Sequence, residues 1–230
     1  MTYPINPNTI VIQNNFYQEG LKEIDIWEYY VKNKSSLLKE TINRDIMFVI
    51  STDVNQFVIK RQGTDTNFLR LSNSNYLKLV NGRTVSIYST MNKYENFGII
   101  DIDTDDWNKA RETTRKIYLS LQNLKNINDL QIRYTGKKSF HIKCQFKTIY
   151  HIDDIRKMFY YHLINDRNLE DYTVQKKRNH RTPNIDIYPN VFRGGYITLH
   201  SLSIWGLRCK EVDFNRLDNF VPDSSKILTL

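Results

Sequence analysis

Cysteine is scarce in this chain of 230 residues, which contains only Cys144 and Cys209. Neither belongs to a Cys-x-x-Cys pair, so the usual spacing of a structural zinc site is missing and no zinc site is expected. A disulfide framework is equally unsupported, because two such cysteines fit the buried, reduced thiols of an intracellular protein. The fold is therefore expected to rest on a hydrophobic core.

Long hydrophobic runs are also absent. No apolar stretch approaches the roughly 18 residues that cross a membrane. The opening residues, Met-Thr-Tyr-Pro-Ile-Asn-Pro, lack the basic and apolar regions of a signal peptide. We therefore expect a soluble cytoplasmic protein, at a nucleoid or replication site, with no membrane partner.

What the chain does contain is an ample core and an excess of positive charge. Hydrophobic residues make up 40% of it and aromatic residues 13%, enough for one large domain or two small, closely packed units. The 33 Lys and Arg residues outnumber the 25 Asp and Glu residues and give a net charge of +8. Such a charge favours a polyanionic partner, for which nucleic acid is the default candidate.

The apolar patterns alternate between helical and strand spacing. Helical spacing occurs over 25–38, with a break near 33–36, over 105–124 and over 153–165. Other apolar runs predict strands at 45–50, 57–61, 97–103, 130–134, 139–146, 184–188, 196–199 and 202–212. Asn81-Gly82 lies between 76–80 and 84–88 and predicts a β-hairpin of these two runs. The alternation, without a Gly-rich nucleotide loop, favours an α+β sheet core over a Rossmann unit.

The run Phe97-Gly98-Ile99-Ile100-Asp101-Ile102-Asp103 ends in two aspartates spaced by one residue. On a strand this spacing places both carboxylates on one face and Ile100 and Ile102 on the other. Two like charges side by side repel unless a cation separates them, and Mg²⁺ is commonly held by one or two carboxylates together with substrate phosphates. The alternative is a strand that enters a solvated acidic turn, in which Asp105 and Asp106 cap the next helix.

Three further segments carry polar groups at strand junctions. The segment Thr135-Gly-Lys-Lys-Ser-Phe-His141 offers N–H groups, hydroxyls, ammonium groups and an imidazole suited to gripping phosphates. Asp186 lies within the apolar run 184–188, where an unpaired charge is costly. Arg208 closely follows an aromatic residue in Trp205-Gly-Leu-Arg208. Simpler alternatives are an Asp186 paired with an arginine and a packed or solvated His141.

Five segments match a known family pattern in the correct order. They are Phe16–Tyr30, with its Gly, Lys and Tyr-Tyr pair; Phe57-Val-Ile-Lys60, similar to Phe-x-x-Lys; Thr135–His141, similar to Ser-Gly-Gly-Lys-Gly-Leu-His; Asp186–Asn190, similar to Asp-Tyr-x-x-Asn; and Trp205–Arg208, similar to Tyr-Ser-x-Arg. With the Asp-x-Asp pair, they resemble the archaeo-eukaryotic primase superfamily, and more closely the polymerase domain of bacterial DNA ligase D. The resemblance covers nearly the whole chain.

The resemblance implies a set of site residues. Asp101, Asp103 and Asp186 would hold two divalent ions, Mn²⁺ or Mg²⁺, and form the catalytic centre. The triphosphate of the incoming nucleotide would be bound by Thr135, Lys138, Ser139, His141 and Arg208, with Lys60 as an addition. Lys22 would meet a 5′-phosphate or the template backbone. Lys137 and Ser139 replace glycines of the family turn, which predicts a less tightly wound phosphate turn.

The resemblance also implies a fold and an activity. The expected fold is α+β, with mixed or antiparallel sheets, including an RRM-like unit, flanked by helices. Residues 1–230 would form a single primase-polymerase catalytic domain, with an N-terminal unit of about 1–95 and a metal-bearing unit of about 96–230. The expected enzyme is a metal-dependent nucleotidyltransferase, a DNA primase or polymerase that adds nucleotides from NTPs or dNTPs in replication or repair. Its partners would be DNA template and primer, or RNA, with a helicase, a ligase or a larger primase assembly as further candidates.

Two alternatives from other functional classes remain open. One is a catalytically silent nucleic-acid-binding subunit with the same fold, which the basic charge supports but the three carboxylates do not. The other is a metal-dependent nuclease, since nucleases also use clustered carboxylates. Metal-dependent nucleotide affinity and the degradation of DNA without a triphosphate distinguish these alternatives from a polymerase.

Overall fold

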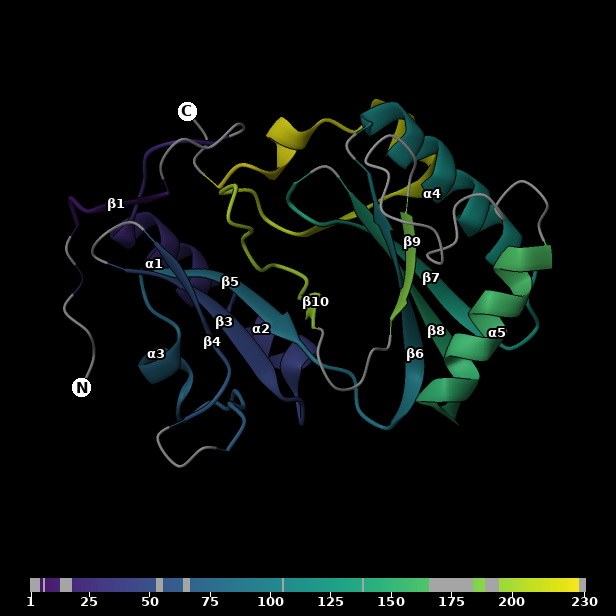
Figure 1. Ribbon diagram of the computed structural model, residues 1–230. Coiled ribbons are helices and arrows are strands. Elements are labelled where there is room, and N and C mark those ends of the chain that lie inside the picture. The colour runs from purple at the N-terminus through teal and green to yellow at the C-terminus, as the bar shows by residue number, and fades with distance from the viewer. Residues whose placement is uncertain are drawn as a thin grey trace. The chain divides into compact units, whose positions relative to one another are not determined.

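The chain forms two compact units (Figure 1). The structure, a computed structural model, describes residues 5, 7–12, 18–52, 56–63, 67–104, 106–137, 139–165, 184–188 and 195–227, with the backbone alone at 164–165 and 184–188. The first unit contains the described residues of Met1–Thr90, Gly195–Lys210 and Val221–Leu230. The second contains those of Met91–Gly194 and Glu211–Phe220.

The first unit is built on a four-stranded sheet with the order β10-β5-β3-β4. Its strands are β3 (Ile46–Ser51), β4 (Phe57–Lys60), β5 (Thr84–Ser89) and β10 (Tyr196–Ile197), and β1 (Ile10–Ile12) and β2 (Leu21–Lys22) form a separate ribbon. Its helices are α1 (Glu23–Lys32), α2 (Lys34–Thr41), α3 (Tyr76–Leu79) and the short 3₁₀ helix η3 (Pro222–Ser225). The predicted helix break is confirmed at Asn33, which ends α1 and precedes α2.

The hairpin predicted around Asn81-Gly82 is wrong, because the run before it forms helix α3 instead of a strand. The Asn75 side chain accepts a hydrogen bond from the Ser72 backbone N–H at 2.8 Å, and this turn leads directly into the helix. Gly82 does not adopt the positive φ that a type I′ hairpin turn requires. Its role is close packing, since a Cβ atom there would lie 2.4 Å from the Glu23 carbonyl oxygen.

Two neighbouring tyrosines of α1, the partly buried Tyr29 and the buried Tyr30, attach the returning segment Gly195–Lys210 to the rest of the first unit. The Tyr29 hydroxyl donates to the His200 carbonyl at 2.8 Å. The Tyr30 hydroxyl accepts from the Leu202 N–H at 3.1 Å. Burial raises the pKa of both phenols, so they stay neutral donors and acceptors at physiological pH. The Tyr-Tyr pair of the sequence motif is therefore structural in this unit.

The second unit contains a five-stranded sheet with the order β11-β7-β8-β6-β9. Its elements are β6 (Tyr94–Asp103), α4 (Trp107–Gln122), β7 (Ile127–Tyr134), β8 (Phe140–His151), α5 (Ile152–Asn165), β9 (Asn184–Tyr188), β11 (Lys210–Val212) and the 3₁₀ helix η2 (Phe214–Asn219). From β6 to β9 they follow a β-α-β-β-α-β order, and β6 pairs antiparallel with both β8 and β9. This is the RRM-like arrangement, so the predicted α+β class with antiparallel sheets and flanking helices is confirmed.

One face of this sheet is covered by α4 and α5, which lie beside the strands in Figure 1. Ile100 and Ile102 of β6 pack there against helix residues that include Ile117 and Phe159. Cys144 lies in the same core; burial raises the pKa of its thiol, and Cys209 is also a free, buried cysteine. The expected burial of both cysteines is therefore confirmed.

Helix α4 begins as the acidic turn predicted. The Asp106 carboxylate is its N-cap and accepts hydrogen bonds from the backbone N–H groups of Asn108 and Lys109. Asp105 lies outside the described residues. Later in the helix, Arg115 pairs with Asp218 of η2 and lowers the pKa of that carboxyl group, which attaches the 211–220 segment to this unit.

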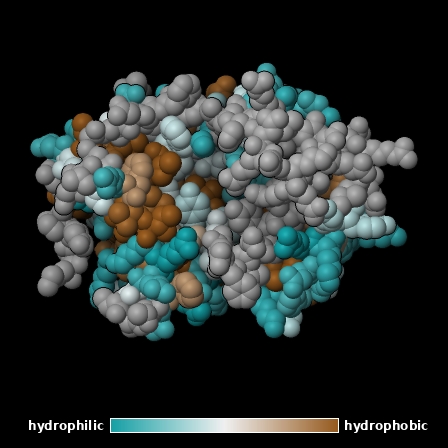
Figure 2. Space-filling model, in the orientation of Figure 1, coloured by the Kyte–Doolittle hydropathy of each residue, from teal (hydrophilic) through white to brown (hydrophobic). Residues whose placement is uncertain are grey.

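The edge strand β4 of the first unit exposes apolar side chains. Figure 2 shows hydrophobic surface in brown over the part of the first unit where β4, its edge strand, lies, and Phe57, Val58 and Ile59 of that strand are exposed. Exposed apolar residues on an edge strand are unusual, because they invite pairing with another chain.

None of the helices that the structure describes is both long and apolar enough to cross a bilayer.

Candidate functional site

The aspartate pair lies at the end of β6, on the face of the sheet opposite the helices. Ile100 and Ile102 point into the core beneath α4 and α5, so the alternation of the strand places Asp101 and Asp103 on the other face. The Asp101 side chain is 19% exposed and Asp103 is exposed. The predicted one-faced carboxylate pair is therefore present.

Strand register aligns the other predicted residues with this pair. Asp101 lies opposite His141 of β8 on one side and opposite Asp186 of β9 on the other. Arg133 of β7 lies opposite His141, which extends the row to four neighbouring strands. Residues directly opposite each other in antiparallel strands are the closest neighbours across a sheet. Residues 101, 141 and 186, which are widely separated in sequence, therefore occupy one row of the second unit.

His141 contacts one of the two carboxylates, that of Asp101. Its Nε2 atom lies 3.3 Å from Asp101 Oδ1, and its side chain is only 6% exposed. Its other ring nitrogen, Nδ1, is buried and has no hydrogen-bond partner among the residues that the structure describes. An unpartnered polar atom in a buried site is costly unless a further group satisfies it, which makes this histidine a candidate for contact with a ligand.

The predicted phosphate turn joins β7 to β8 next to the end of β6. Ile102 of β6 lies opposite Phe140, the first residue of β8, so the turn that precedes β8 lies at the level of Asp103. The Thr135 N–H donates to the Ser139 carbonyl at 3.1 Å, and the two hydroxyls are 2.8 Å apart. Gly136 has a φ of +84°, which favours glycine. Lys138 lies outside the described residues.

An aromatic cluster supports this turn from within the second unit. The rings of Trp107 and Phe140 are 5.2 Å apart, and those of Tyr134 and Phe220 are 5.0 Å apart. Trp107 is the first residue of α4, so the cluster packs the helix that follows the aspartates against the strands that carry the turn. Core packing is thus the described role of Trp107, which has an Arg111 guanidinium over its ring.

Replacing Tyr134 by phenylalanine should loosen the turn without disturbing the cluster. The Tyr134 hydroxyl donates to the Lys137 carbonyl at 2.6 Å across the turn, and the variant loses this bond while it keeps the aromatic ring. We expect the free energy of unfolding to fall by about 1 kcal/mol, measured by urea denaturation. Tyr150→Phe in the same sheet, where no hydroxyl hydrogen bond is described, is the matched control. Equal losses in the two variants would contradict a role for this bond.

Three predicted binding residues belong to the first unit. Lys60 ends strand β4, and Lys22 is the exposed N-cap of α1. Arg208 is half-buried; its backbone N–H donates to the Ser225 carbonyl at 3.0 Å, and its Nη2 atom lies 3.3 Å from the Ser224 carbonyl oxygen. The Arg208 Nε atom is buried without a described partner. Their predicted contacts with nucleotide or nucleic acid stay predictions.

The donor atoms of the row suit hard divalent cations. Carboxylate oxygens are the ligands that Mg²⁺ and Mn²⁺ prefer. Among the side chains that the structure describes, no group of three His, Cys, Asp or Glu residues is arranged to hold a metal. The described side chains include those of Asp101, Asp103 and His141 but not that of Asp186. The donor chemistry therefore fits the predicted ions, whereas their binding stays a proposal.

One residue of the row was missed by the sequence interpretation. Arg133 is 1% exposed, and its Nη2 atom donates to Gln131 Oε1 at 2.9 Å. A buried guanidinium one strand from His141 contributes positive charge to a row that contains two aspartates. The available signal was the arginine within the apolar alternation of 130–134, the same signal that drew attention to Asp186.

Comparison with known proteins places this geometry in context. No protein-family model matches the sequence, and no curated protein matches it. Among solved structures, the chain is similar to the polymerase domain of Mycobacterium tuberculosis Ligase D, determined in complex with DNA. The TM-score is 0.74 at 11% sequence identity, over 92% of this chain and 89% of that chain. At this identity the likeness concerns the fold alone, and it confirms the resemblance drawn from the motifs: the chain has the fold of the Ligase D polymerase domain.

Proposed function

We propose that this protein is a metal-dependent nucleotidyltransferase, a DNA primase or polymerase that joins nucleotides from nucleoside triphosphates to a nucleic-acid strand. The observation that carries the proposal is the row of Asp101, His141 and Asp186 on adjacent strands of a polymerase-like fold. The row puts acidic residues beside a turn rich in hydrogen-bonding groups. Phosphoryl transfer depends mainly on such positioning and charge neutralisation.

The carboxylates of Asp101, Asp103 and Asp186 would hold two Mn²⁺ or Mg²⁺ ions. When bound, such a pair activates the attacking hydroxyl, aligns the in-line displacement and stabilises the departing pyrophosphate. The repulsion between the aspartates is relieved at the same time, which accounts for keeping like charges two residues apart.

The turn and His141 would orient the triphosphate. In this proposal Thr135, Lys138 and Ser139 bind phosphate oxygens through hydroxyls, N–H groups and an ammonium group. The imidazole of His141 donates a hydrogen bond from one ring nitrogen to a phosphate oxygen. This bond adds a partner to a buried ring whose Nδ1 atom has none among the described residues. The buried Arg133 adds positive charge behind the histidine.

DNA is the proposed template and primer. The similar structure is a polymerase domain in complex with DNA, and the net charge of +8 gives this chain the field that attracts such a polyanion. The row supports a catalytic role more than a silent nucleic-acid-binding subunit, because a silent subunit has no need of a carboxylate beside a buried histidine. Replication and repair are both proposed settings for this activity.

Binding of a nucleoside triphosphate should depend on metal. We expect Mn²⁺ to strengthen the affinity at least about tenfold, or 1.4 kcal/mol, in the absence of any strand, and Asp101→Ala to remove this increase. Isothermal titration with and without Mn²⁺ measures it. An affinity indifferent to Mn²⁺ would favour the silent subunit, and degradation of labelled DNA without any triphosphate would favour the nuclease.

A further inference from the structure

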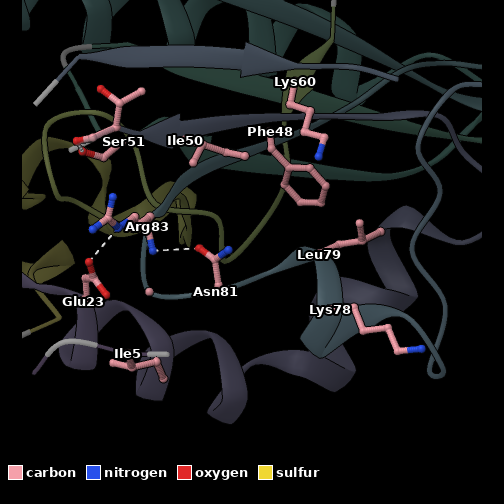
Figure 3. Close-up of a pocket in the computed structure, with 12 residues that line it drawn as sticks. Ile5, Glu23, Phe48, Ile50, Ser51, Lys60, Lys78, Leu79, Asn81 and Arg83 are labelled. Atoms are coloured by element: carbon pink, nitrogen blue, oxygen red, sulfur yellow. Dashed lines mark hydrogen bonds and ion pairs between the residues drawn. The ribbon is translucent and has the colours of Figure 1, made fainter. Parts of the chain in front are cut away.

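A cavity of about 300 Å³ lies within the first unit (Figure 3). Its lining comes from the sheet, from the start of α1, and from α3 with the segment after it: Ile5, Glu23, Phe48, Ile50, Ser51, Thr52, Lys60, Lys78, Leu79, Asn81, Gly82 and Arg83. Every one of these residues belongs to the first unit, whereas the aspartate row belongs to the second. The cavity is thus a separate feature with its own residues.

The sheet supplies an apolar floor with a cation beside it. Phe48 lies directly opposite Lys60 in the antiparallel pair of β3 and β4, so both residues and Ile50 share one face of the sheet. Figure 3 shows the Lys60 side chain reaching down beside the Phe48 ring. Leu79 of α3 adds apolar surface on the other side. The floor suits a flat, weakly polar group such as a nucleobase.

The charges around the cavity favour an anion. Three cations, Lys60, Lys78 and Arg83, line it together with one carboxylate, Glu23. Arg83 Nε is 2.7 Å from Glu23 Oε1, so that pair is internally neutralised. Neither Lys60 nor Lys78 makes an ion pair with a described residue. Lys78 extends outward at the rim in Figure 3, whereas Lys60 lies over the interior.

Short polar side chains line the cavity near the C-terminal end of β3. Ser51 and Thr52 follow the floor residues directly, and Asn81 and Gly82 face them from the segment before β5. Gly82 lies so close to the Glu23 backbone that no side chain fits, which keeps the Asn81–Arg83 wall in place. Hydroxyl and amide groups of this kind bind phosphate oxygens or a sugar hydroxyl.

We propose that this cavity binds a nucleoside phosphate of about one nucleotide in size, with its phosphate at Lys60 and Lys78 and its base on Phe48, Ile50 and Leu79. The volume lies at the lower end of ligand pockets, which run from about 300 to 1,000 Å³, and limits the occupant to a single nucleotide. This assigns Lys60 to a site of the first unit, in place of the triphosphate role that the family resemblance implies. The site requires no metal and no aspartate of the second unit.

The test is titration of a nucleoside monophosphate into the full chain with EDTA present, followed by isothermal calorimetry. We expect a dissociation constant of about 1 mM or tighter, and weakening by about tenfold in Lys60→Gln or Lys78→Gln through loss of one charge-assisted contact. Lys39→Gln, on the exposed surface of α2 away from the cavity, is the matched control and should bind normally. Arg83 is left in place because its removal would take away the ion-pair partner of the buried Glu23 carboxylate.

Two further arms locate the ligand and identify its source. Hydrogen exchange should show protection confined to 48–52 and 78–83 when the monophosphate is bound. A dinucleotide with a 5′-phosphate, compared with the same dinucleotide with a 5′-hydroxyl, distinguishes a strand end from a free nucleotide. Binding of the 5′-phosphorylated dinucleotide alone supports the proposal and identifies a strand end, whereas binding of the monophosphate but of neither dinucleotide supports it and identifies a free nucleotide. Equally tight binding of both dinucleotides contradicts it.

Failure of this proposal is separable from failure of the proposed polymerase. Asp101→Ala should bind the monophosphate as the wild type does, because the cavity lies in the other unit. Absence of binding by wild type, normal binding by both lysine variants, or loss of binding in Asp101→Ala would each overturn the proposal. None of these results depends on incorporation activity.

Discussion

Replacing Asp101 or Asp103 by alanine is expected to abolish nucleotide incorporation while leaving nucleic-acid binding largely intact. Both residues lie on the helix-free face of β6, and neither contributes to the core beneath it. Their proposed role is to hold the ions that neutralise developing charge, which is worth several kcal/mol. Since each 1.36 kcal/mol is tenfold in rate, we expect a loss of at least about 10³-fold, measured by primer extension with Mn²⁺.

The matched control for these variants is Asp129→Ala. Asp129 is an exposed aspartate on β7 of the same sheet, outside the row of Asp101, so this substitution makes the same chemical change elsewhere. It should incorporate nucleotides at the wild-type rate. Retained incorporation by Asp101→Ala, or an equal loss in Asp129→Ala, would show that the row is not the catalytic centre.

Replacing Phe159 by alanine should destabilise the second unit by about 3–5 kcal/mol. Phe159 is fully buried between α5 and the sheet, and its ring lies 5.7 Å from that of Phe146. A Cβ atom at Gly98 would lie 2.4 Å from its Cε2 atom, so the helix packs directly on the backbone of the strand that carries the aspartates. Because domains are stable by only about 5–15 kcal/mol, the space left by the missing ring should remove a large fraction of the free energy of unfolding.

Urea denaturation monitored by far-UV circular dichroism measures this loss. The control is Tyr160→Ala, the next residue of α5, whose side chain is 36% exposed. Surface substitutions of this kind usually change stability by less than about 0.5 kcal/mol. Similar destabilisation by the two variants would contradict the packing described for this helix.

Much of the second unit follows from local sequence patterns. The apolar run that ends at Asp103, the helix capped by Asp106 and the strand 184–188 all have the predicted character, because hydrophobic periodicity reports directly which face is buried. The phosphate turn was located between its two strands for the same reason. Local patterns therefore identified the elements that carry the candidate site.

The register of the strands could not be predicted from these local patterns. Nothing local states that Asp186 lies opposite Asp101, because strand pairing depends on the order of strands in the sheet and not on the spacing within one strand. The family resemblance supplied that grouping as an expectation. Arg133 escaped notice because its importance comes from its neighbours across the sheet.

The first unit shows two further limits. Asn81-Gly82 has the composition of a hairpin turn, yet its glycine is needed for close approach to Glu23, a tertiary contact that no short-range rule detects. The segment Gly195–Lys210 returns to this unit through hydrogen bonds to Tyr29 and Tyr30, more than 160 residues earlier in the chain. The division predicted near residue 95 did not include that return.

The most direct test of the central proposal is an incorporation assay on a single-stranded template with mixed ribo- and deoxyribonucleotides and Mn²⁺, with and without a primer. We expect products longer than the primer with the wild type and none with Asp101→Ala. Products without a primer would identify a primase, and products only with a primer would identify a polymerase that extends existing ends. No incorporation under either condition, by a folded wild-type protein, would contradict the proposed function.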